Sequence, residues 1–257
     1  MKNDLVLRPS YWASVSGGKD SLYMLHYILN NLDRYPLDGV VHFELEIDYP
    51  FIHNVIDYME AECRKYDIPF VRFKPRQSWE ELYYKYGFPT RKCRWCNSKY
   101  KLDCNKQLNE WLNSLGYYTV EYIGYCADEE HRFAKRKNAK KLERYPLAEN
   151  SINEDSILEW AKTQPIFKNY YKTNKRCGCM YCPMSSYLNF AYLYKYYPEN
   201  FRYMIEKMRE TEKLRERELG RPFSVISSNP RYNSDYLENI IKTKWLKKLN
   251  ESEVNEK

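Results

Sequence analysis

The segment Ser16-Gly17-Gly18-Lys19-Asp20-Ser21 constrains the fold of this chain more than any other feature. The apolar run Tyr11 to Val15 before it is typical of a short buried strand, and Asp20 to Leu32 has the apolar spacing of a helix. A strand that passes through two glycines into a helix directs backbone N–H groups and the positive end of the helix dipole to one place. The sequence therefore predicts an anion cradle, with hydroxyl groups from Ser16 and Ser21 and a charge from Lys19.

The loop differs from the other common phosphate loops. A Walker A loop needs glycine where this chain has Ala13, and serine or threonine where it has Asp20. The segment SGGKDS instead resembles the signature of the PP-loop ATP pyrophosphatases. That resemblance implies cleavage of ATP between its α and β phosphates, or binding of an adenylyl sulfate in the same place. An ordinary Gly-Gly turn with a serine cap is the alternative, and the strand–loop–helix context favours the nucleotide.

Strands and helices alternate through the first part of the chain. Further strands are expected at 39–47, 69–73 and 118–124, and helices at 51–66 and 95–115. This order predicts an α/β fold with a doubly wound, mostly parallel sheet and helices on both faces. After Pro146 only helical candidates follow, at 155–162, 185–196, 200–219 and 235–249. We expect a PP-loop nucleotide-binding domain over 1–165, a helical region with cysteines over 166–250, and a charged, disordered tail over 251–257.

Several further motifs resemble the phosphoadenosine phosphosulfate (PAPS) reductase family, and they occur in the family's order. They are Tyr49-Pro50 after the second strand, Arg94-Trp95-Cys96, the segment Gly124 to Arg132, and the segment Arg176 to Pro183. The resemblance covers about residues 11–185 and implies an adenine-nucleotide site, for ATP, PAPS or adenylyl sulfate (APS). Its expected residues are Ser14, Ser16, Gly17, Gly18, Lys19, Asp20, Ser21, Glu44, Gly124, Asp128 and Arg132, with Lys19 and Asp20 also as catalytic candidates.

The chain also departs from that family in three places. Glu44-Leu45-Glu46 replaces the family's Asp-Thr-Gly, and Cys126 replaces an arginine that faces the anionic end of the substrate. No cysteine follows Cys182, whereas the assimilatory reductases carry their catalytic cysteine in a C-terminal motif. The usual reductase nucleophile is therefore missing from its usual place.

The cysteines form two close pairs, Cys93-x-x-Cys96 and Cys179-x-x-Cys182. Thiolates two residues apart can bind one metal, so the four sulfurs predict a 4Fe-4S cluster, with zinc as the second choice. We expect the pairs to converge at the nucleotide-binding edge of the sheet. Small buried apolar residues are the alternative interpretation. Cys177 and Cys126 remain as catalytic candidates that could carry a persulfide if nearby cations lower their pKa. A buried, unreactive thiol is the alternative, and for Cys126 it is the favoured one.

Charge and composition bear on partners. The formal net charge is +7, and the segment His131 to Lys141 is strongly basic. That segment could bind tRNA or DNA, hold the anionic end of a small nucleotide, or be a solvated helix face. The chain shows no apolar leader and no membrane-spanning run, and its cysteines suit a reducing compartment, so we expect a cytoplasmic protein. A homodimer is a candidate assembly.

Three functions remain open at this stage. The first is adenylation of an acceptor by ATP, with Mg²⁺ held near Asp20 or Asp128, followed by transfer of sulfur from a sulfur donor. The second is reduction of PAPS or APS to sulfite with a thiol reductant. The third belongs to another class: a regulator that binds nucleotide or nucleic acid without turnover.

Overall fold

The computed structural model describes residues 7–134 and 142–255. The chain divides into two compact units, each of which is described by itself. The first unit comprises Met1–Leu45, Pro50–Arg76 and Leu102–Asn169; the second comprises Glu46–Tyr49, Gln77–Lys101 and Tyr170–Lys257. The main division at 169/170 lies near the expected boundary at 165/166, but the segment that carries Cys93 and Cys96 belongs to the second unit.

The first unit contains a five-stranded sheet in which every strand pair is parallel. The strand order is β3-β2-β1-β4-β5, so the order reverses between β1 and β4. Open α/β sheets bind ligands in the crevice outside the carboxyl ends of the strands at such a reversal. The strands are β1 (Arg8–Val15), β2 (Gly39–Phe43), β3 (Phe70–Phe73), β4 (Tyr117–Tyr122) and β5 (Leu142–Arg144).

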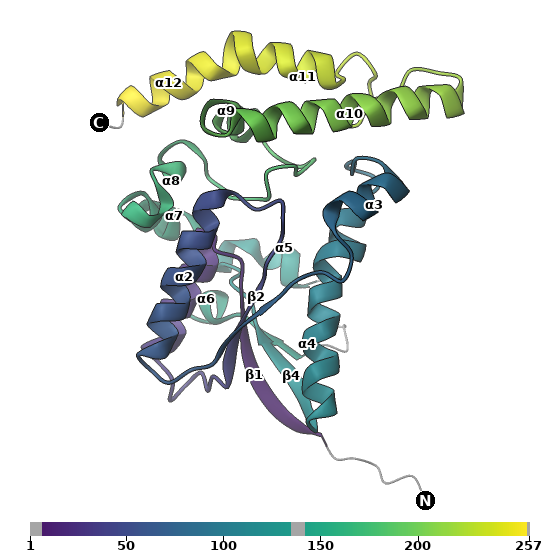
Figure 1. Cartoon of the computed structure of the whole chain (residues 1–257). Helices are drawn as coiled ribbons and strands as arrows, with labels where there is room; N and C mark the ends of the chain where they lie inside the picture. The colour runs from purple at the N-terminus through teal and green to yellow at the C-terminus, as the bar shows by residue number, and fades with distance from the viewer. Residues whose placement is uncertain (1–6, 135–141, 256–257) are drawn as a thin grey trace, which may run out of the picture. The chain divides into compact units, whose positions relative to one another are not determined.

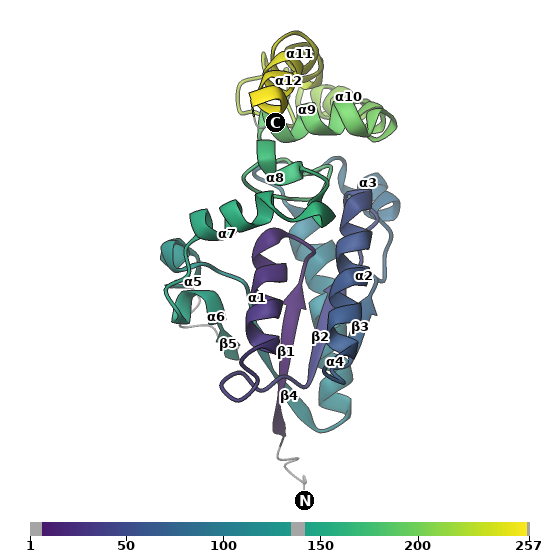
Figure 2. The same ribbon diagram turned by 90° about the vertical axis from the view of Figure 1, so that its left-hand side faces the viewer.

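Helices cover both faces of this sheet. Helices α1 (Lys19–Leu29) and α2 (Pro50–Arg64) lie on one face and α4 (Leu102–Ser114) on the other (Figure 1 and Figure 2). On the α4 face, Trp12 packs with Val41 and with Leu108 and Leu112 of α4. Trp12 is paired in register with Gly39, and its indole fills the space where a side chain at Gly39 would lie.

Shorter helices complete the first unit. A 3-10 turn, η2, follows β4, and α6 and α7 follow β5; α7 packs against α1. Their bounds are η2 (Ala127–Glu129), α5 (Glu130–Phe133), α6 (Pro146–Glu149), α7 (Glu154–Lys162) and η4 (Pro165–Phe167).

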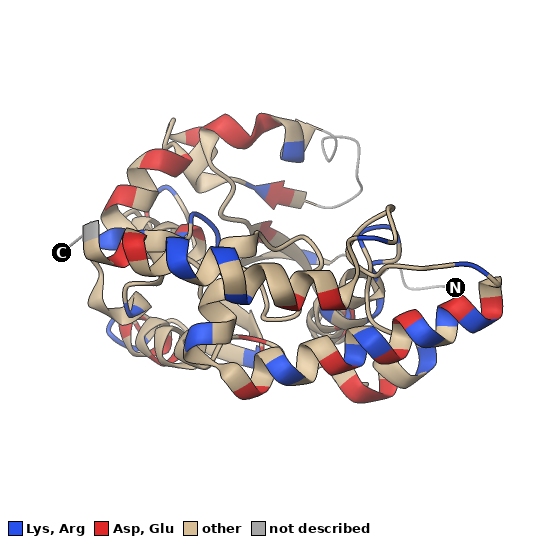
Figure 3. Cartoon of the chain, turned by 90° about the horizontal axis from the view of Figure 1, so that it is seen from above, with Lys and Arg blue, Asp and Glu red and all other residues tan. Residues whose placement is uncertain are grey.

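Among its described residues, the regular secondary structure of the second unit is all helical, with loops between the helices. Helices α9 and α10 pack against a C-terminal run formed by α11, the π-helix η5 and α12 (Figure 1). The exposed surface of α10 carries both signs of charge along its length (Figure 3). The elements are α3 (Trp79–Tyr86), the π-helix η1 (Cys96–Lys101), α8 (Tyr170–Thr173), α9 (Tyr187–Tyr196), α10 (Pro198–Leu219), α11 (Ser234–Ile240), η5 (Ile241–Trp245) and α12 (Leu246–Asn255).

The expected fold class is confirmed, and the differences are local. The expected helix 95–115 begins as the π-helix η1, continues as α4 and ends before Gly116, whose φ is 85°. Helix α3 and strand β5 were not expected. The tail expected to be disordered from Glu251 is helical through Asn255, because Lys195 and Tyr196 bind Glu253. Among the described residues, no helix is both long and apolar enough to cross a membrane.

Candidate active site

The glycine loop joins β1 to α1 at the carboxyl edge of the sheet. Gly17 has a φ of +74°, a left-handed conformation that side chains rarely adopt, and a Cβ there would lie 2.7 Å from Ile52 Cγ2. Gly18 is extended and caps the N-terminus of α1. Both glycines are therefore used: Gly17 makes the turn, and Gly18 presents bare backbone at the positive end of the helix.

Hydrogen bonds within the loop hold its shape. The Ser16 N–H donates to Ser21 Oγ at 3.2 Å, and Ser21 Oγ donates to the Gly18 carbonyl at 2.9 Å. The hydroxyls of Ser16 and Ser21 are 3.4 Å apart. Ser21 therefore closes the loop on itself and fixes the positions of the backbone groups that face a ligand.

Lys19 is held by carboxylates. Its ammonium is 2.7 Å from Asp20 Oδ1 and 3.2 Å from Glu154 Oε1, and its side chain is 1% exposed. The cation that the sequence suggested for a phosphate thus also ties the loop to the start of α7. Glu154 gave no signal in the sequence, because 135 residues separate it from Lys19.

Asp20 lies between Lys19 and Cys126. Burial raises the pKa of Asp20, while the charge of Lys19 opposes that rise. The Cys126 thiol donates to Asp20 Oδ1 at 3.7 Å. Burial, and then the carboxylates of Asp20 and Glu129, raise the pKa of Cys126. The pKa of Cys126 is therefore not lowered, as a persulfide carrier would require, and its rise agrees with the alternative of a buried thiol.

The segment after β4 forms the other side of the crevice. Gly124 packs closely on the loop, because a Cβ there would lie 3.0 Å from the Asp20 carbonyl oxygen. Asp128 Oδ1 accepts the Glu154 N–H at 3.1 Å. Arg132 binds Glu129 at 2.6 Å and covers the Tyr125 ring at 4.2 Å. Gly124, Asp128 and Arg132 therefore lie on the segment that borders the glycine loop.

Two expected residues have partners that the sequence did not suggest. Ser14 Oγ donates to Glu121 Oε1 at 2.5 Å, and Asn105 binds the other oxygen of Glu121 at 3.3 Å. A buried carboxylate in the middle of a strand was the signal that could have identified Glu121. Glu44 lies after β2 and its ion-pair partner is Lys74, at 3.3 Å.

The crevice carries more carboxylates than cations. Asp20 and Glu154 bind Lys19, Glu129 binds Arg132, and Asp128 accepts the Glu154 N–H. No three His, Cys, Asp or Glu side chains in 7–134 or 142–255 are placed to hold a metal ion. Mg²⁺ does not need such a cage, since it is usually bound by one or two carboxylates together with substrate phosphates. Asp20, in the loop, and Asp128, on the segment after β4, are the carboxylates that fit that use.

The cysteine motifs lie in the second unit. Cys96 begins the π-helix η1, and Cys179 and Cys182 lie in one turn, where the Cys182 N–H donates to the Cys179 carbonyl at 3.2 Å. The Cys179 thiol donates to Cys182, which lowers the pKa of Cys182 to about 6 and raises that of Cys179. The Lys101 ammonium interacts with all three sulfurs, and its pKa is raised chiefly by Cys179.

The remaining cysteines of these motifs differ from that group. Cys93 is exposed, and its N–H donates to Thr90 Oγ1 at 2.9 Å. Burial raises the pKa of Cys177 to about 12, so the expected low-pKa thiolate at this position is wrong. Three of the four expected ligands, Cys96, Cys179 and Cys182, thus share one environment. Their soft donor set suits iron or zinc, although the described positions do not form a closed site.

The basic segment His131 to Lys141 is only partly described. Residues 135–141 lie outside the described residues, so the three interpretations of this segment remain predictions.

Comparison with known proteins gives three findings. The sequence profile of the phosphoadenosine phosphosulfate reductase domain matches residues 10–185. An uncharacterized protein of Methanocaldococcus jannaschii is 29% identical over 211 residues, or 76% of this chain and 47% of that protein. The chain thus spans about half the length of this relative. A solved tRNA thiolase, NcsA from Methanococcus maripaludis with its 4Fe-4S cluster, is 18% identical at a TM-score of 0.40, covering 83% of this chain and 74% of that one.

Proposed function

Because this chain belongs to the phosphoadenosine phosphosulfate reductase family, we propose that it binds an adenine nucleotide on the Ser16–Ser21 loop and uses it in sulfur transfer. The observation that carries the proposal is the position of that loop. It lies at the strand-order reversal, with Gly17 in a left-handed conformation and the N-terminus of α1 behind it. Backbone N–H groups at such a point stabilise phosphate charge.

The proposed reaction has two balanced steps. An oxygen of the acceptor attacks the α-phosphorus of ATP, the bond to the β-phosphate oxygen breaks, and pyrophosphate leaves. A hydrosulfide then attacks the adenylated carbon, the carbon–oxygen bond breaks, and AMP leaves with that oxygen. No atom changes oxidation state, so this version needs a sulfide-level donor and no reductant.

The residues of the crevice suit the first step. Mg²⁺ brought by ATP would be bound by its phosphates with Asp20 and Asp128. Lys19, fixed by Glu154, would offset charge on the α-phosphate as the pentacoordinate phosphorus forms. Gly124 keeps the loop after β4 close enough to Asp20 to close one side of the site.

We also propose Cys93, Cys96, Cys179 and Cys182 as ligands of a 4Fe-4S cluster, with zinc as the alternative. A bound cluster would supply iron to which a sulfide ligand can bind. The support is the shared environment of Cys96, Cys179 and Cys182 beside Lys101, whose positive charge offsets that of thiolates. The reducing cytoplasm is the compartment proposed, because all eight cysteines are free.

Metal content tests this ligand set. Protein purified without oxygen should contain about four irons per chain, as one 4Fe-4S cluster requires. Cys96→Ala or Cys182→Ala should lose the metal. Cys104→Ala is the matched control, because Cys104 is a buried single cysteine on α4 and should leave the metal content unchanged. Equal metal content in all variants, or none in the wild type, would refute the ligand set.

A second candidate function, reduction of PAPS or APS, is favoured by the Cys179–Cys182 pair. A thiolate attacks the sulfur of the sulfate group, the sulfur–oxygen bond to the nucleotide breaks, and PAP or AMP leaves. The neighbouring thiol then attacks the S-sulfocysteine, releasing sulfite and forming a disulfide. A dithiol reductant must restore the pair. The hydrogen bond from Cys179 to Cys182 supports this candidate, because the second attack needs two neighbouring sulfurs.

One experiment separates these functions. Anaerobic protein is incubated with ATP, hydrosulfide and bulk tRNA or DNA, and separately with PAPS and a dithiol. AMP, pyrophosphate and thiolated nucleic acid indicate sulfur transfer, whereas sulfite indicates reduction. Neither product would reject both enzymes and leave a non-catalytic nucleotide- or nucleic-acid-binding regulator.

A loop variant checks that any turnover uses the glycine loop. Gly18→Val should abolish ATP or PAPS binding in calorimetry while the chain stays folded, because Gly18 is in an extended conformation open to any residue. Gly116→Ala is the control, since an added Cβ there meets no atom within 4 Å and Gly116 lies outside the proposed sites. Unchanged nucleotide affinity in Gly18→Val would show that the loop is not the nucleotide site.

A further inference from the structure

A cavity of about 570 Å³ in the second unit is lined by aromatic side chains. It lies among the start of α9, the loop that leads into α11, and the π-helix η5. Its volume falls within the range of small-molecule pockets, about 300–1,000 Å³. The rings that line it belong to Tyr187, Phe190, Tyr232, Tyr236 and Trp245.

Four of the rings form two contacting pairs. Tyr187 and Trp245 have centroids 5.3 Å apart with an angle of 30° between their planes. Tyr232 and Tyr236 meet edge to face at 4.9 Å. Phe190 is buried and forms part of the floor. Tyr187, Tyr232, Tyr236 and Trp245 are at least partly exposed, and aromatic side chains at one pocket suit a flat aromatic heterocycle, because every nucleobase has a π-face for stacking.

The polar groups of the pocket are donors and hydroxyls. Arg91 donates Nε to the Pro183 carbonyl at 3.3 Å, which orients its guanidinium at the wall. Ser185 and Ser227 add hydroxyl groups, and no carboxylate lines the pocket. A heterocycle rich in carbonyl and ring-nitrogen acceptors, attached to a phosphate, complements this set.

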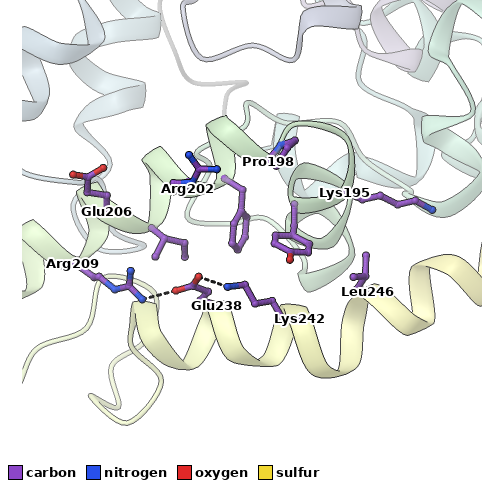
Figure 4. A pocket seen from close by; sticks show the side chains of 11 residues that line it. Lys195, Pro198, Arg202, Glu206, Arg209, Glu238, Lys242 and Leu246 are labelled. Atoms are coloured by element: carbon purple, nitrogen blue, oxygen red, sulfur yellow. Dashed lines mark hydrogen bonds and ion pairs between the residues drawn. The ribbon is translucent and has the colours of Figure 1, made fainter.

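A second cavity in the same unit has the opposite character. It is about 590 Å³ and is formed by α9, α10, α11, η5 and α12 (Figure 4). Glu206 and Glu238 line it, and Glu238 already binds Arg209 and Lys242. Its cations are neutralised within the protein, so it is a poor site for an anionic ligand.

Neighbours in the chain link the aromatic pocket to the cysteines. Pro183, which lines the pocket, directly follows Cys182, and Arg91 precedes Cys93 by two residues. Lys92 and Arg94 beside Arg91 are both exposed. The pocket residue Arg91 therefore belongs to a short, exposed basic segment of the chain that can contact phosphates.

We propose that this pocket binds a nucleobase of a single-stranded nucleic acid. The base stacks on the Tyr187–Trp245 and Tyr232–Tyr236 rings, and Arg91 donates to its acceptor edge. Lys92 and Arg94 contact the flanking phosphates. This inference names the class of acceptor for the proposed sulfur transfer. The role of the bound strand as an acceptor rests on that proposed function, whereas the binding itself does not.

One wall of the pocket is held by a buried carboxylate. Glu212 of α10 accepts hydrogen bonds from the Val225 N–H at 3.0 Å and the Ser234 hydroxyl at 2.5 Å. These bonds fix both ends of the loop that carries Ser227 and Tyr232. A loop held in place by such bonds lowers the entropic cost of binding.

Binding of labelled octamers tests the proposal. Fluorescence anisotropy measures the affinity of the full chain for single-stranded RNA and DNA octamers, without ATP or sulfur donor. Tyr232→Ala should weaken binding about tenfold or more through lost stacking. Tyr232 is 43% exposed, so this variant should fold; Tyr84→Ala, a 72% exposed tyrosine on α3 outside the pocket, is the matched control. Trp245→Ala should weaken binding further, with circular dichroism to verify folding.

Competition with mononucleotides and the affinities of the variants decide the proposal. Displacement of the octamer by free UMP or AMP supports base recognition with a free nucleotide as a sufficient ligand; failure of the mononucleotides to compete supports recognition of a strand. No octamer binding, or equal affinity in Tyr232→Ala and Tyr84→Ala, overturns the proposal. Octamer binding without ATP turnover would reject the proposed sulfur-transfer function and support the nucleobase pocket. Sulfur transfer to nucleic acid that Tyr232→Ala does not affect would support that function and reject the pocket.

Discussion

Replacing Gly17 by alanine should destabilise the first unit through two separable costs. The left-handed φ of +74° costs a residue with a Cβ about 1 kcal/mol. The new methyl would also lie 2.7 Å from Ile52 Cγ2, and such overpacking costs about 2 kcal/mol. Ile52 cannot simply move aside, because Cγ2 is attached at the branched β-carbon of a helical residue. The expected loss in the free energy of unfolding is about 3 kcal/mol.

Urea unfolding followed by far-UV circular dichroism measures this loss. With a denaturant slope near 3 kcal/mol/M, the midpoint should fall by about 1 M. Gly116→Ala is the control for the backbone cost alone, since Gly116 has a φ of +85° but no atom within 4 Å of an added Cβ. It should lose only about 1 kcal/mol.

A double-mutant cycle isolates the clash. Ile52→Ala alone should cost about 3 kcal/mol, but it removes Cγ2, so Gly17→Ala should cost only about 1 kcal/mol in that background. The coupling free energy is then about 2 kcal/mol, whereas Ile52→Ala should show no coupling with Gly116→Ala. Additive losses for Gly17→Ala and Ile52→Ala would refute the assigned loop conformation.

Two further predictions concern buried groups of the first unit. Lys19→Met should lower the free energy of unfolding by about 2–3 kcal/mol, because it leaves Asp20 and Glu154 without their cation. Lys247→Met, which removes the cation of the exposed Lys247–Glu251 pair, should cost less than about 1 kcal/mol. Urea unfolding of both variants decides this, and equal losses would contradict it. Burial lowers the pKa of His42, whose Nδ1 is 3.0 Å from the Val15 carbonyl oxygen, so the unfolded chain binds the proton more readily. Stability should therefore be complete above about pH 6.5 and fall as the pH decreases below that value. Unfolding midpoints measured from pH 5 to 8 should show a slope that His42→Gln reduces; an unchanged slope would show that another group titrates.

The sequence allowed the sheet and the loop to be predicted because their signals are local. The apolar alternation before Ser16 and the two glycines specify a strand, a turn and a helix start within about ten residues of one another. Gly116 marked the end of α4 for the same reason. The capping box of Ser78 and Glu81 was equally local and could have revealed α3.

Features that depend on distant residues could not be predicted in this way. Lys19 resembles a phosphate ligand in the sequence, and only the fold shows that Glu154 binds it. The pKa of Cys126 follows from burial beside Asp20 rather than from the basic residues near it in the chain. The aromatic pocket combines side chains from separate helices. The π-helix η1 has no recognised sequence periodicity from which it could be predicted.

The interleaving of the two units limits how this protein can be divided. The chain passes from one unit to the other after Leu45, Tyr49, Arg76, Lys101 and Asn169. Cutting it after Asn169 would therefore separate the Cys179–Cys182 turn from the segment that holds Cys96 and Lys101, instead of releasing a complete domain. Neither unit is one continuous segment of the chain, so neither can be exchanged between proteins by a single cut and join. The nucleotide loop and the cysteine motifs are therefore inherited and expressed together.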